Sequence, residues 1–375
     1  MCFDTHSSVA APMTEQTSGE PSQMPTRDAS SRGRSIRPST PEDGPAIVAL
    51  MRAAGLEPTV DPAHLHWKYW QSRADWSGPR SFVVADGAEV LAHGALVPGT
   101  LRSPGAEARV IHMIDWAARR EAIGAGVQLM KHVGNQADFL LGIGGSEHTR
   151  KIMPLIGYRL CGKVTGFVRP LAPLRLLKEV GGPPWKRIAR SARSALWSVS
   201  APRVRSSAWS SRPVTASEVA QMASVLPAPR AGLAVLGRTP AFFKYALTCP
   251  IVSLELHALH RAGHLKGYFA LSYASSQIRL ADLWVDSADP EDWRGLVLSA
   301  VRAARRKQEA VEIAAWSSDP ALSLVLHECG FHARFTLPIY LRGSHGARDP
   351  EKSLRVQMLD NDAFYLHSDH NELWA

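Results

Sequence analysis

The residues whose types and spacing point most clearly to a function lie in segment 111–127. There an apolar strand pattern is followed by a short turn and then by a helix pattern. In the turn, Arg119, Ala122 and Gly124 stand at positions i, i+3 and i+5. The first backbone N–H groups of a helix have no partner within it. Together with the positive helix end they bind phosphate or pyrophosphate, and small residues let the anion approach the backbone. The segment therefore predicts a phosphate-binding turn.

Hydrophobic patterns on both sides predict the elements that position this turn. Ile36–Pro38 is expected to begin the folded part, and Ser39–Asp43 resembles the capped start of a helix. A hairpin with Asp86-Gly87 at its tip precedes the turn, and short helices alternate with strands after it. The expected strands are 81–85, 90–97, 111–116, 139–143 and 163–169, and the expected helices are 127–133 and 146–156.

The pattern R-x-x-A-x-G on a strand-to-helix turn resembles the R-x-x-G-x-G/A pyrophosphate loop of the GNAT (Gcn5-related N-acetyltransferase) superfamily. The order of elements over about residues 36–170 is also similar to the order in that family. Two departures are visible: the first loop glycine is Ala122, and no proline precedes Arg119. The resemblance implies an α/β fold with mostly antiparallel mixed sheets flanked by helices.

Because the family uses acetyl-CoA, the resemblance implies acetyl-CoA or another acyl-CoA as co-substrate, and no metal. The residues that it implies at the co-substrate are Trp116, Ala117, Arg119, Arg120, Ala122, Ile123, Gly124 and Ala125. A turn of the same spacing that binds nothing remains the alternative.

Acyl transfer from a thioester requires a base for the proton of the attacking amine and a donor for the developing oxyanion. Asp115, at the end of the central strand, is the first candidate for the base, and His112 is the second. The alternative for Asp115 is a structural acid bonded to the backbone or to Arg119.

Many GNAT enzymes carry a tyrosine general acid four residues before the glycine of a G-F/Y pair. Here the pair is Gly157-Tyr158 and the position is Met153, which cannot donate a proton. The thiolate would then take its proton from solvent, or the activity has been lost. Other polar residues at the mouth between strand and helix are Ser146, Glu147 and His148.

A second set of the same patterns follows, with expected strands 254–260, 265–273, 278–285 and 311–316 and helices 296–305 and 320–328. In this second set, Leu326 occupies the position of the tyrosine general acid, four residues before the glycine of the pair Gly330-Phe331. We therefore predict tandem GNAT-like domains. The predicted boundaries are a disordered tail 1–34, a domain 36–170, a connector 171–212, a degenerate domain 213–345 and a C-terminal tail 346–375.

The second copy lacks the phosphate turn, because its counterpart is the segment D-S-A-D-P-E-D-W-R-G from Asp286 to Gly295. We read this segment as a loop carrying four acids. Desolvated carboxylates would repel a pyrophosphate. The co-substrate is therefore assigned to the first copy.

Net charge is concentrated in the connector. The chain carries +9, and segment 171–212 holds nine basic residues and one acid. Within it, 185–199 is amphipathic, with apolar residues at helical spacing and arginines toward another side. Three interpretations stay open: a linker helix docked on a domain with its arginines solvated, a helix on an anionic membrane surface, and a contact with nucleic acid or another acidic partner.

Composition fits a globular protein of two domains, with 375 residues and 45% hydrophobic residues. No apolar run reaches the roughly 18 residues of a membrane span, and the start of the chain has no secretory signal pattern. Four separated cysteines predict reduced thiols in a cytosolic protein, with peripheral binding at the inner membrane face as an alternative.

Two further segments carry chemistry-bearing residues. His66–Trp70 is expected either near an acceptor cleft or, more simply, as an aromatic helix face packed on the sheet. Near the end, Leu359–Asp362 resembles a segment that lines the domain junction in some tandem acyltransferases. The nearby cluster His367, Asp369, His370, Asp360 and Asp362 lacks metal-site spacing.

The leading prediction is an acyl-CoA-dependent N-acyltransferase, in its narrower form an N-acetyltransferase, acting on a small amine such as an amino sugar or a biosynthetic intermediate. One alternative is an aminoacyl or long-chain acyltransferase of the same fold at a membrane surface. The other is a non-catalytic GNAT-like binding protein, favoured by Met153 and Leu326. Motifs typical of common hydrolases, P-loop proteins and zincins do not occur in the sequence.

Overall fold

The computed structural model of the protein describes residues 33–56, 58, 60–175, 183–200, 208–274, 276–344 and 353–365. Most of the predicted tail 1–34 lies outside these residues. From Arg34 onward, the described residues form one compact unit. We call Arg34–Pro170 the first half and Trp209–Gly343 the second half. The domain boundaries between them remain a prediction.

The first half contains the elements that the sequence predicted around the turn, with longer strands. They are β1 (Arg34–Pro38), η1 (Pro41–Asp43), α1 (Gly44–Ala53), α2 (Pro62–Leu65), the π-helical turn η2 (His66–Trp70), β2 (Ser81–Asp86), β3 (Glu89–Ser103), β4 (Ala106–Ala118), α3 (Ala125–Gly134), β5 (Phe139–Ile143), α4 (Glu147–Leu155) and β6 (Arg159–Pro170).

The helix α6 (Pro184–Ser200) precedes the second half. The elements that follow are β7 (Trp209–Val214), η3 (Val219–Val225), β8 (Leu233–Leu236), α7 (Pro240–Ala246), β9 (Ser253–Arg261), β10 (His264–Ala274), β11 (Gln277–Val285), α8 (Pro290–Ala304), β12 (Glu312–Ser317), α9 (Pro320–Glu328), β13 (His332–Gly343), β14 (Ser353–Arg355), η4 (Met358–Asp360) and η5 (Asp362–Phe364). None of the described helices is long and apolar enough to cross a membrane.

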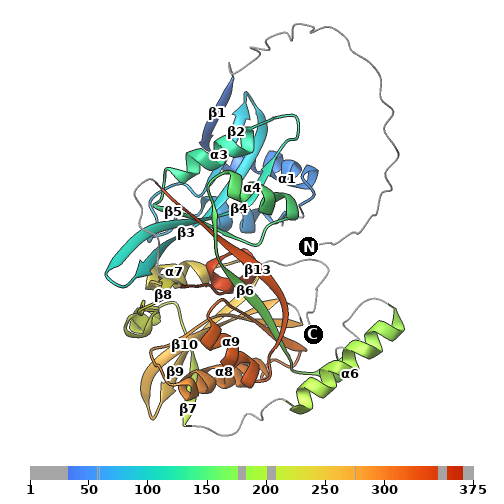
Figure 1. Ribbon diagram of the computed structural model, residues 1–375, viewed down its shortest axis with the longest axis vertical. Helices are drawn as coiled ribbons and strands as arrows, with labels where there is room; N and C mark the ends of the chain where they lie inside the picture. Colours follow the sequence, from blue (N-terminus) through green and yellow to red (C-terminus); the bar gives the residue numbers. More distant parts are fainter. Residues whose placement is uncertain are drawn as a thin grey trace, which may run out of the picture. The chain divides into compact units, whose positions relative to one another are not determined.

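The described strands form one 14-stranded sheet with the main order β1-β2-β3-β4-β5-β13-β6-β12-β11-β10-β9-β7. Most neighbours are antiparallel, whereas β4–β5 and β11–β12 are parallel. The two halves exchange their last strands, because β13 lies between β5 and β6, and β6 lies between β13 and β12. Figure 1 shows these two long strands passing through the middle of the molecule.

Side-chain alternation builds a core on each face of the first half. In β2, Phe82 and Val84 pack with Leu129 of α3, whereas Val83 packs with Ile47 of α1. Successive residues of a strand point to opposite faces. The helices α1 and α3 therefore cover opposite faces of the sheet.

Two predictions of local structure are wrong. The segment Asp286–Gly295 is not all loop, because Asp289 accepts a hydrogen bond from the Glu291 backbone and Pro290 begins α8. The predicted tail from residue 346 contains an ordered stretch, Ser353–Tyr365, in which β14 pairs with β8. That stretch buries Leu354, Val356, Met358, Leu359, Phe364 and Tyr365.

Candidate active site

The pairing between β4 and β5 in the first half is short, and we call the region past its last pair the opening between β4 and β5. The parallel ladder joins only Val110–His112 to Phe139–Leu141, while β4 continues to Ala118. Beyond His112, β4 and β5 are not paired. The backbone groups of β4 that face β5 therefore have no strand partner there among the described residues. Backbone donors in such a position can bind a carbonyl oxygen or an oxyanion.

A bulge in β4 directs Asp115 out of the strand. Ala95 pairs with Ile114 and His93 pairs with Ala117, so two residues of β4 oppose Gly94 alone. Asp115 has φ 51°, a left-handed value that is uncommon for a residue other than glycine. The sequence placed Asp115 at the strand end, whereas the structure places it at this bulge, before the strand ends at Ala118.

Asp115 is held by two neighbours in η2. Its Oδ2 atom lies 2.6 Å from Nζ of Lys68 and accepts a hydrogen bond of 2.7 Å from the Tyr69 hydroxyl. Only 11% of the Asp115 side chain is exposed. Burial alone would raise the pKa of this carboxyl, but the Lys68 ammonium and the two donors outweigh it and lower the pKa below its usual value. The carboxylate is therefore ionised and fixed in place.

The two histidines of this region are both neutral near pH 7. His93 contacts the Ser81 hydroxyl at 2.9 Å and the Asp115 carbonyl at 3.2 Å, and burial lowers its pKa to about 4. Burial also lowers the pKa of His112 to about 4, opposed by the backbone of Asp360. Thus His112 faces the C-terminal segment, and the structure does not bring it to Asp115.

The turn that the sequence predicted between Arg119 and Ala125 leads into α3. Gly124, with φ 81°, is the N-cap residue and offers no side-chain cap to the first N–H groups of the helix. Ala122 and Ala125 are buried below the turn, whereas Ile123 is 85% exposed. A Cβ added at Gly124 would meet nothing within 4 Å, so the space above the helix start is open. This geometry fits an anion bound to backbone donors.

The arginines of the turn differ in their surroundings. Nε of Arg119 donates to the Val90 carbonyl at 3.1 Å, and its Nη1 lies 3.3 Å from the carboxylate of Glu89. Arg119 thus contacts the β2–β3 hairpin end, so the alternative in which Asp115 is bonded to Arg119 is wrong. Arg120 is exposed.

The two β4 residues before the turn lie on opposite faces. Trp116 packs on the α3 side, where its Nε1 atom donates to the Gly126 carbonyl at 3.2 Å. Ala117 lies in the cluster with α1. Of these two residues, only Trp116 reaches the helix whose start would hold the anion.

A small cavity lies between the two halves, and Lys68, the partner of Asp115, is one of the residues that line it. It holds about 30 Å³, enough for one or two water molecules. Its walls are aromatic and cationic. The residues that line it are Trp67, Lys68, Arg73, Arg80, Leu96, Val97, Ile114, Phe242, Tyr245, Ala246, Leu359, Asn361, Phe364 and Tyr365.

The cavity is closed by contacts between the halves. The rings of Trp67 and Tyr245 stack at 4.7 Å, and the Tyr245 hydroxyl donates to the Trp67 carbonyl at 2.8 Å. Arg80 donates to the same hydroxyl at 2.8 Å. In His66–Trp70, Tyr69 thus packs in the core as the simpler interpretation expected, while Trp67 and Lys68 line the cavity.

The sequence interpretation included Lys68 only as part of the segment His66–Trp70, and it did not name Tyr245 or Tyr365 as residues of this cavity. One signal was available: a lysine inside the aromatic run His66–Trp70 must find a carboxylate once it is buried. Tyr245 and Tyr365 gave no such signal, because their proximity depends on pairing across the two halves.

The second half repeats the arrangement with other residues. A register shift in the β10–β11 pairing lies next to Asp282, which accepts from the Tyr268 hydroxyl at 2.7 Å and from Arg238 Nε at 2.8 Å. Arg238 also pairs with Asp360, so the C-terminal segment completes this network. All four residues are buried, which leaves the arrangement structural in character.

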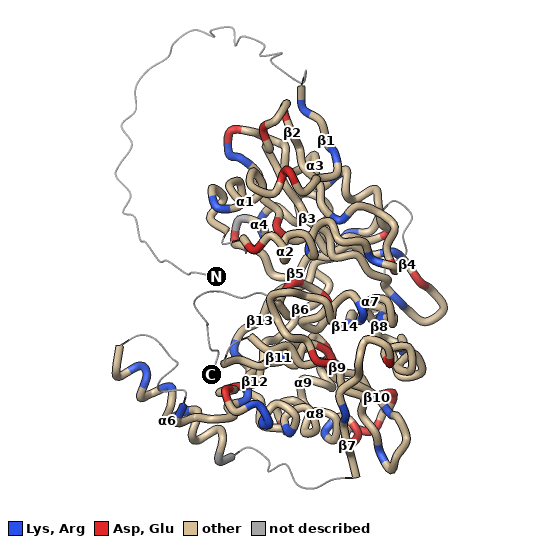
Figure 2. Tube along the Cα trace, turned by 180° about the vertical axis from the view of Figure 1, so that it is seen from behind, with Lys and Arg blue, Asp and Glu red and all other residues tan. Residues whose placement is uncertain are grey.

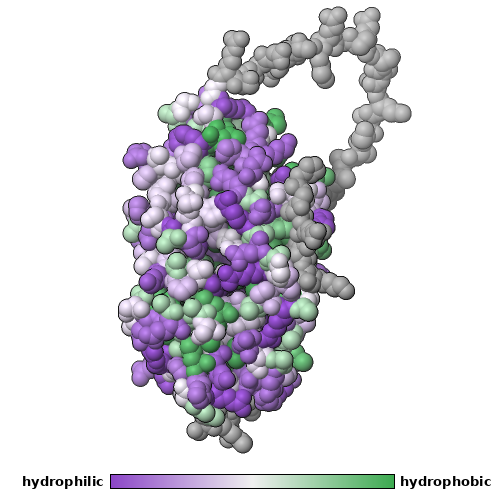
Figure 3. Space-filling model, turned by 90° about the vertical axis from the view of Figure 1, so that its left-hand side faces the viewer, coloured by the Kyte–Doolittle hydropathy of each residue, from purple (hydrophilic) through white to green (hydrophobic). Residues whose placement is uncertain are grey.

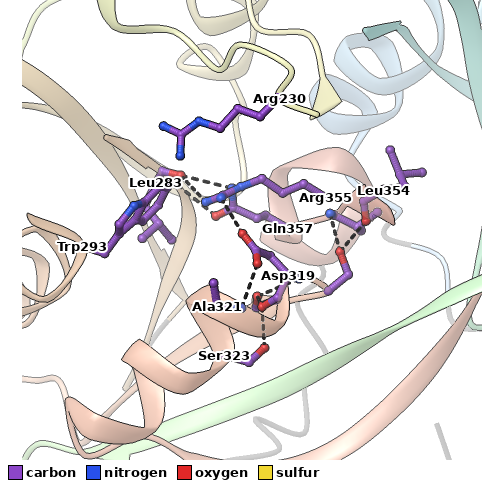
Figure 4. A network of polar contacts seen from close by, with 12 residues as sticks. Arg230, Leu283, Trp293, Asp319, Ala321, Ser323, Leu354, Arg355 and Gln357 are labelled. Carbon is purple, nitrogen blue, oxygen red and sulfur yellow. Dashed lines mark hydrogen bonds and ion pairs between the residues drawn. The ribbon is translucent and has the colours of Figure 1, made fainter. Parts of the chain in front are cut away.

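In the second half, a network of polar contacts joins Arg355 to β11 and to the start of α9 (Figure 4). Arg355 lies 3.2 Å from Asp319 and donates to the Leu283 carbonyl at 3.1 Å, while Asp319 caps α9 through the Ala321 backbone. A cavity of about 220 Å³ lies beside it. Nearby, Asp286 is 70% exposed and pairs with Arg230 at 3.0 Å. The first turn of α8 carries two acids, Glu291 and Asp292.

The two expected tyrosine positions are packing positions. Met153 is buried on β5, so close that a Cβ at Gly142 would lie 2.8 Å from its Cε. Leu326 is fully buried. Ser146 caps α4 by accepting from the Thr149 backbone, and Glu147 pairs with Lys151 on the surface. Within the described residues, no three His, Cys, Asp or Glu side chains could hold a metal; His367, Asp369 and His370 lie outside them.

No protein-family model and no curated protein matches the sequence. Solved structures do match the fold. A GCN5-related N-acetyltransferase from Anabaena variabilis aligns with TM-score 0.55 and 13% identity, over 82% of this chain and 72% of that one. A GCN5-related N-acetyltransferase from Kribbella flavida aligns with TM-score 0.51 and 17% identity, over 83% and 71%.

A third match is the N-myristoyltransferase of Saccharomyces cerevisiae with bound myristoyl-CoA, with TM-score 0.57 and 10% identity, over 85% of this chain and 80% of that one. These proteins share the GNAT fold. At such identities the likeness concerns the fold, and it agrees with the mixed, mostly antiparallel sheet flanked by helices that the sequence predicted. The chain therefore has the GNAT fold.

Proposed function

We propose that the protein is an acyl-CoA-dependent N-acyltransferase, with acetyl-CoA as the first co-substrate to test and a small amine as acceptor. The observation that carries this proposal is the position of Asp115. It stands on the bulge of β4 and pairs with Lys68, which lines a cavity, while the same strand leads to the open turn at Gly124.

In this proposal the turn from Arg119 to Ala125 holds the pyrophosphate through the first N–H groups of α3. The thioester carbonyl lies in the opening between β4 and β5, where backbone donors stabilise the oxyanion. The amine nitrogen attacks the thioester carbon, the C–S bond breaks, and CoA leaves as the thiolate. Because Met153 cannot donate, the thiolate takes its proton from solvent.

Asp115 takes the proton of the amine. Lys68 and Tyr69 both contact Oδ2, and in this proposal Oδ1 accepts the proton. Lys68 and Tyr69 fix the direction of the carboxylate but lower its basicity. In this proposal, the fixed position of the Asp115 carboxylate therefore contributes more to the rate than a match between its pKa and the working pH.

The cavity lined by Lys68, the partner of Asp115, is the proposed acceptor site. Its rings suit an amine with an apolar or planar part. At about 30 Å³ it is smaller than such a molecule, so binding requires a rearrangement of the stacked Trp67 and Tyr245. An amino sugar or a biosynthetic amine remains the proposed class.

The test is release of free CoA from acetyl-CoA and longer acyl-CoAs in the presence of a panel of small amines. Asp115→Asn should lower the turnover by about two to four orders of magnitude. Asp43→Asn is the matched control, because Asp43 also pairs with a cation, Arg37, away from the cavity. Equal turnover by wild type and Asp115→Asn would remove Asp115 from the mechanism.

The second candidate is a non-catalytic acyl-CoA-binding protein. Burial of Met153 and Leu326 at both expected acid positions favours it, as does the ion pair that ties up Asp115. This candidate expects tight binding of acyl-CoA with no CoA release for any amine.

A further inference from the structure

Helix α6 is docked on the protein with its apolar face outward. Trp185, Ile188 and Leu196 are 66%, 63% and 68% exposed, and with Ala192 they recur at intervals of three and four residues. Such spacing places them along one side of a helix. In most surface helices this is the side that faces the core.

The opposite side of α6 makes the contact with the sheet. Ser191 and Ser194 are buried there, where α6 packs on β6. Trp197 stacks on His332 of β13 at 3.9 Å, and Arg193 lies over the Trp197 ring at 4.7 Å. The helix is thus anchored by its polar side, and the docked-linker interpretation does not account for the exposed apolar side.

The charge of α6 has one sign. Figure 2 shows Lys and Arg along the helix and no Asp or Glu, and Lys186 and Arg190 are exposed. Shortly before α6 in the sequence, Leu174 and Arg175 are a further apolar and a further cationic residue, and Leu174 is 79% exposed. On the face in Figure 3, by contrast, hydrophobic residues appear as small separate patches among hydrophilic ones.

We propose that α6 is a membrane-docking helix that places Trp185, Ile188 and Leu196 into the headgroup region of an anionic lipid surface. Apolar side chains flanked by cations match the chemistry of such a surface, and a tryptophan is suited to its interface. Nucleic acid would use the cations and leave the apolar face exposed to water. The proposal does not depend on the acyltransferase function.

The test is flotation of the full chain with vesicles of phosphatidylcholine and phosphatidylserine, compared with phosphatidylcholine alone, at low and high salt. Wild type should float with the anionic vesicles at low salt. Replacing Trp185, Ile188 and Leu196 together by Ser should weaken binding on the order of a hundredfold. The matched control replaces Leu155, Leu160 and Leu324, exposed leucines elsewhere, by Ser and should bind as wild type does.

The cationic contribution is tested separately. The double change Lys186→Gln and Arg190→Gln should weaken binding by roughly thirtyfold at low salt and much less at high salt. Lys244→Gln with Lys266→Gln is the control, because both lysines are exposed outside α6. Brominated lipid should quench the fluorescence of wild type more than that of Trp185→Phe.

Three results would overturn the proposal. One is wild type that stays at the bottom of the gradient with anionic vesicles at low salt. Another is duplex DNA binding that is tighter than vesicle binding and unaffected by the three serine changes. The last is a dimer in sedimentation that the serine changes convert to monomer without any lipid binding. Circular dichroism of each variant confirms that it is folded.

Discussion

The ammonium of Lys68 and the carboxylate of Asp115 lie 2.6 Å apart beside the cavity between the two halves. Lys68 comes from a π-helical turn and Asp115 from a strand bulge, two irregular features that meet at one point. Such features carry a cost in backbone energy and often accompany a functional site.

Removing the Lys68 charge should raise the pKa of Asp115, because burial would then act without a compensating cation. For Lys68→Met we expect the acid limb of the acyl-transfer rate to move to higher pH and the stability to fall by about 3 to 5 kcal/mol. Lys68→Arg retains the cation and should keep the limb near its wild-type position. A pH–rate profile that is identical for Lys68→Met and wild type would show that Asp115 does not act as the base.

Asp362 should destabilise the protein at neutral pH. Burial raises its pKa from 3.8 to about 6, so the folded state binds the proton more tightly than the unfolded state. Stability from this group is present below pH 3.8 and is lost as pH rises through about 6. Asp362→Asn should therefore raise the free energy of unfolding by up to about 3 kcal/mol above pH 7, with little effect near pH 4. Urea unfolding across this range measures the difference, and a gain that is equal at both pH values would contradict the assignment.

The exchange of β6 and β13 predicts that the first half does not fold alone. In a fragment 36–170, β6 would lose β13 and β12, and β5 would lose β13. We expect circular dichroism and hydrogen exchange to show an unfolded or aggregating fragment. A chain cut within 201–207 keeps all of these pairs and should remain one assembly. A fragment 36–170 with a cooperative thermal transition would contradict the prediction.

The regular elements could be predicted because their signals are local. The apolar run Phe139–Ile143 and the capped helix Pro320–Glu328 depend on neighbours in sequence, and both were predicted at the residues where they occur. The ion pair of Lys68 with Asp115 depends on residues 47 positions apart that only the tertiary fold brings together.

The same limit explains the errors. The segment Ser353–Tyr365 reads as a polar tail by its Asp and Asn content, but its apolar residues are buried, and Phe364 and Tyr365 contact Trp67 of the first half. The outward face of α6 could not be predicted either, because an amphipathic pattern does not tell which side faces the protein. The exchange of β6 and β13 leaves no signal in either strand alone.

The number of acyl-CoA molecules bound per chain tests whether the two halves differ in function. Because the start of α8 carries acids where α3 has an open glycine turn, acyl-CoA should bind once per chain. Titration calorimetry with the full chain should give one site. Two equivalent sites would show that the second half also binds acyl-CoA.

Calorimetric titration of acetyl-CoA into Gly124→Glu tests the central claim most directly. A side chain there enters the open space above α3 and adds a like charge, so we expect a loss of measurable CoA binding in a folded protein. Gly105→Glu is the matched control, since Gly105 has a similar φ of 73° and equally open surroundings at the β3–β4 hairpin. The account predicts wild-type affinity for Gly105→Glu and none for Gly124→Glu. Unchanged CoA affinity in folded Gly124→Glu would contradict it.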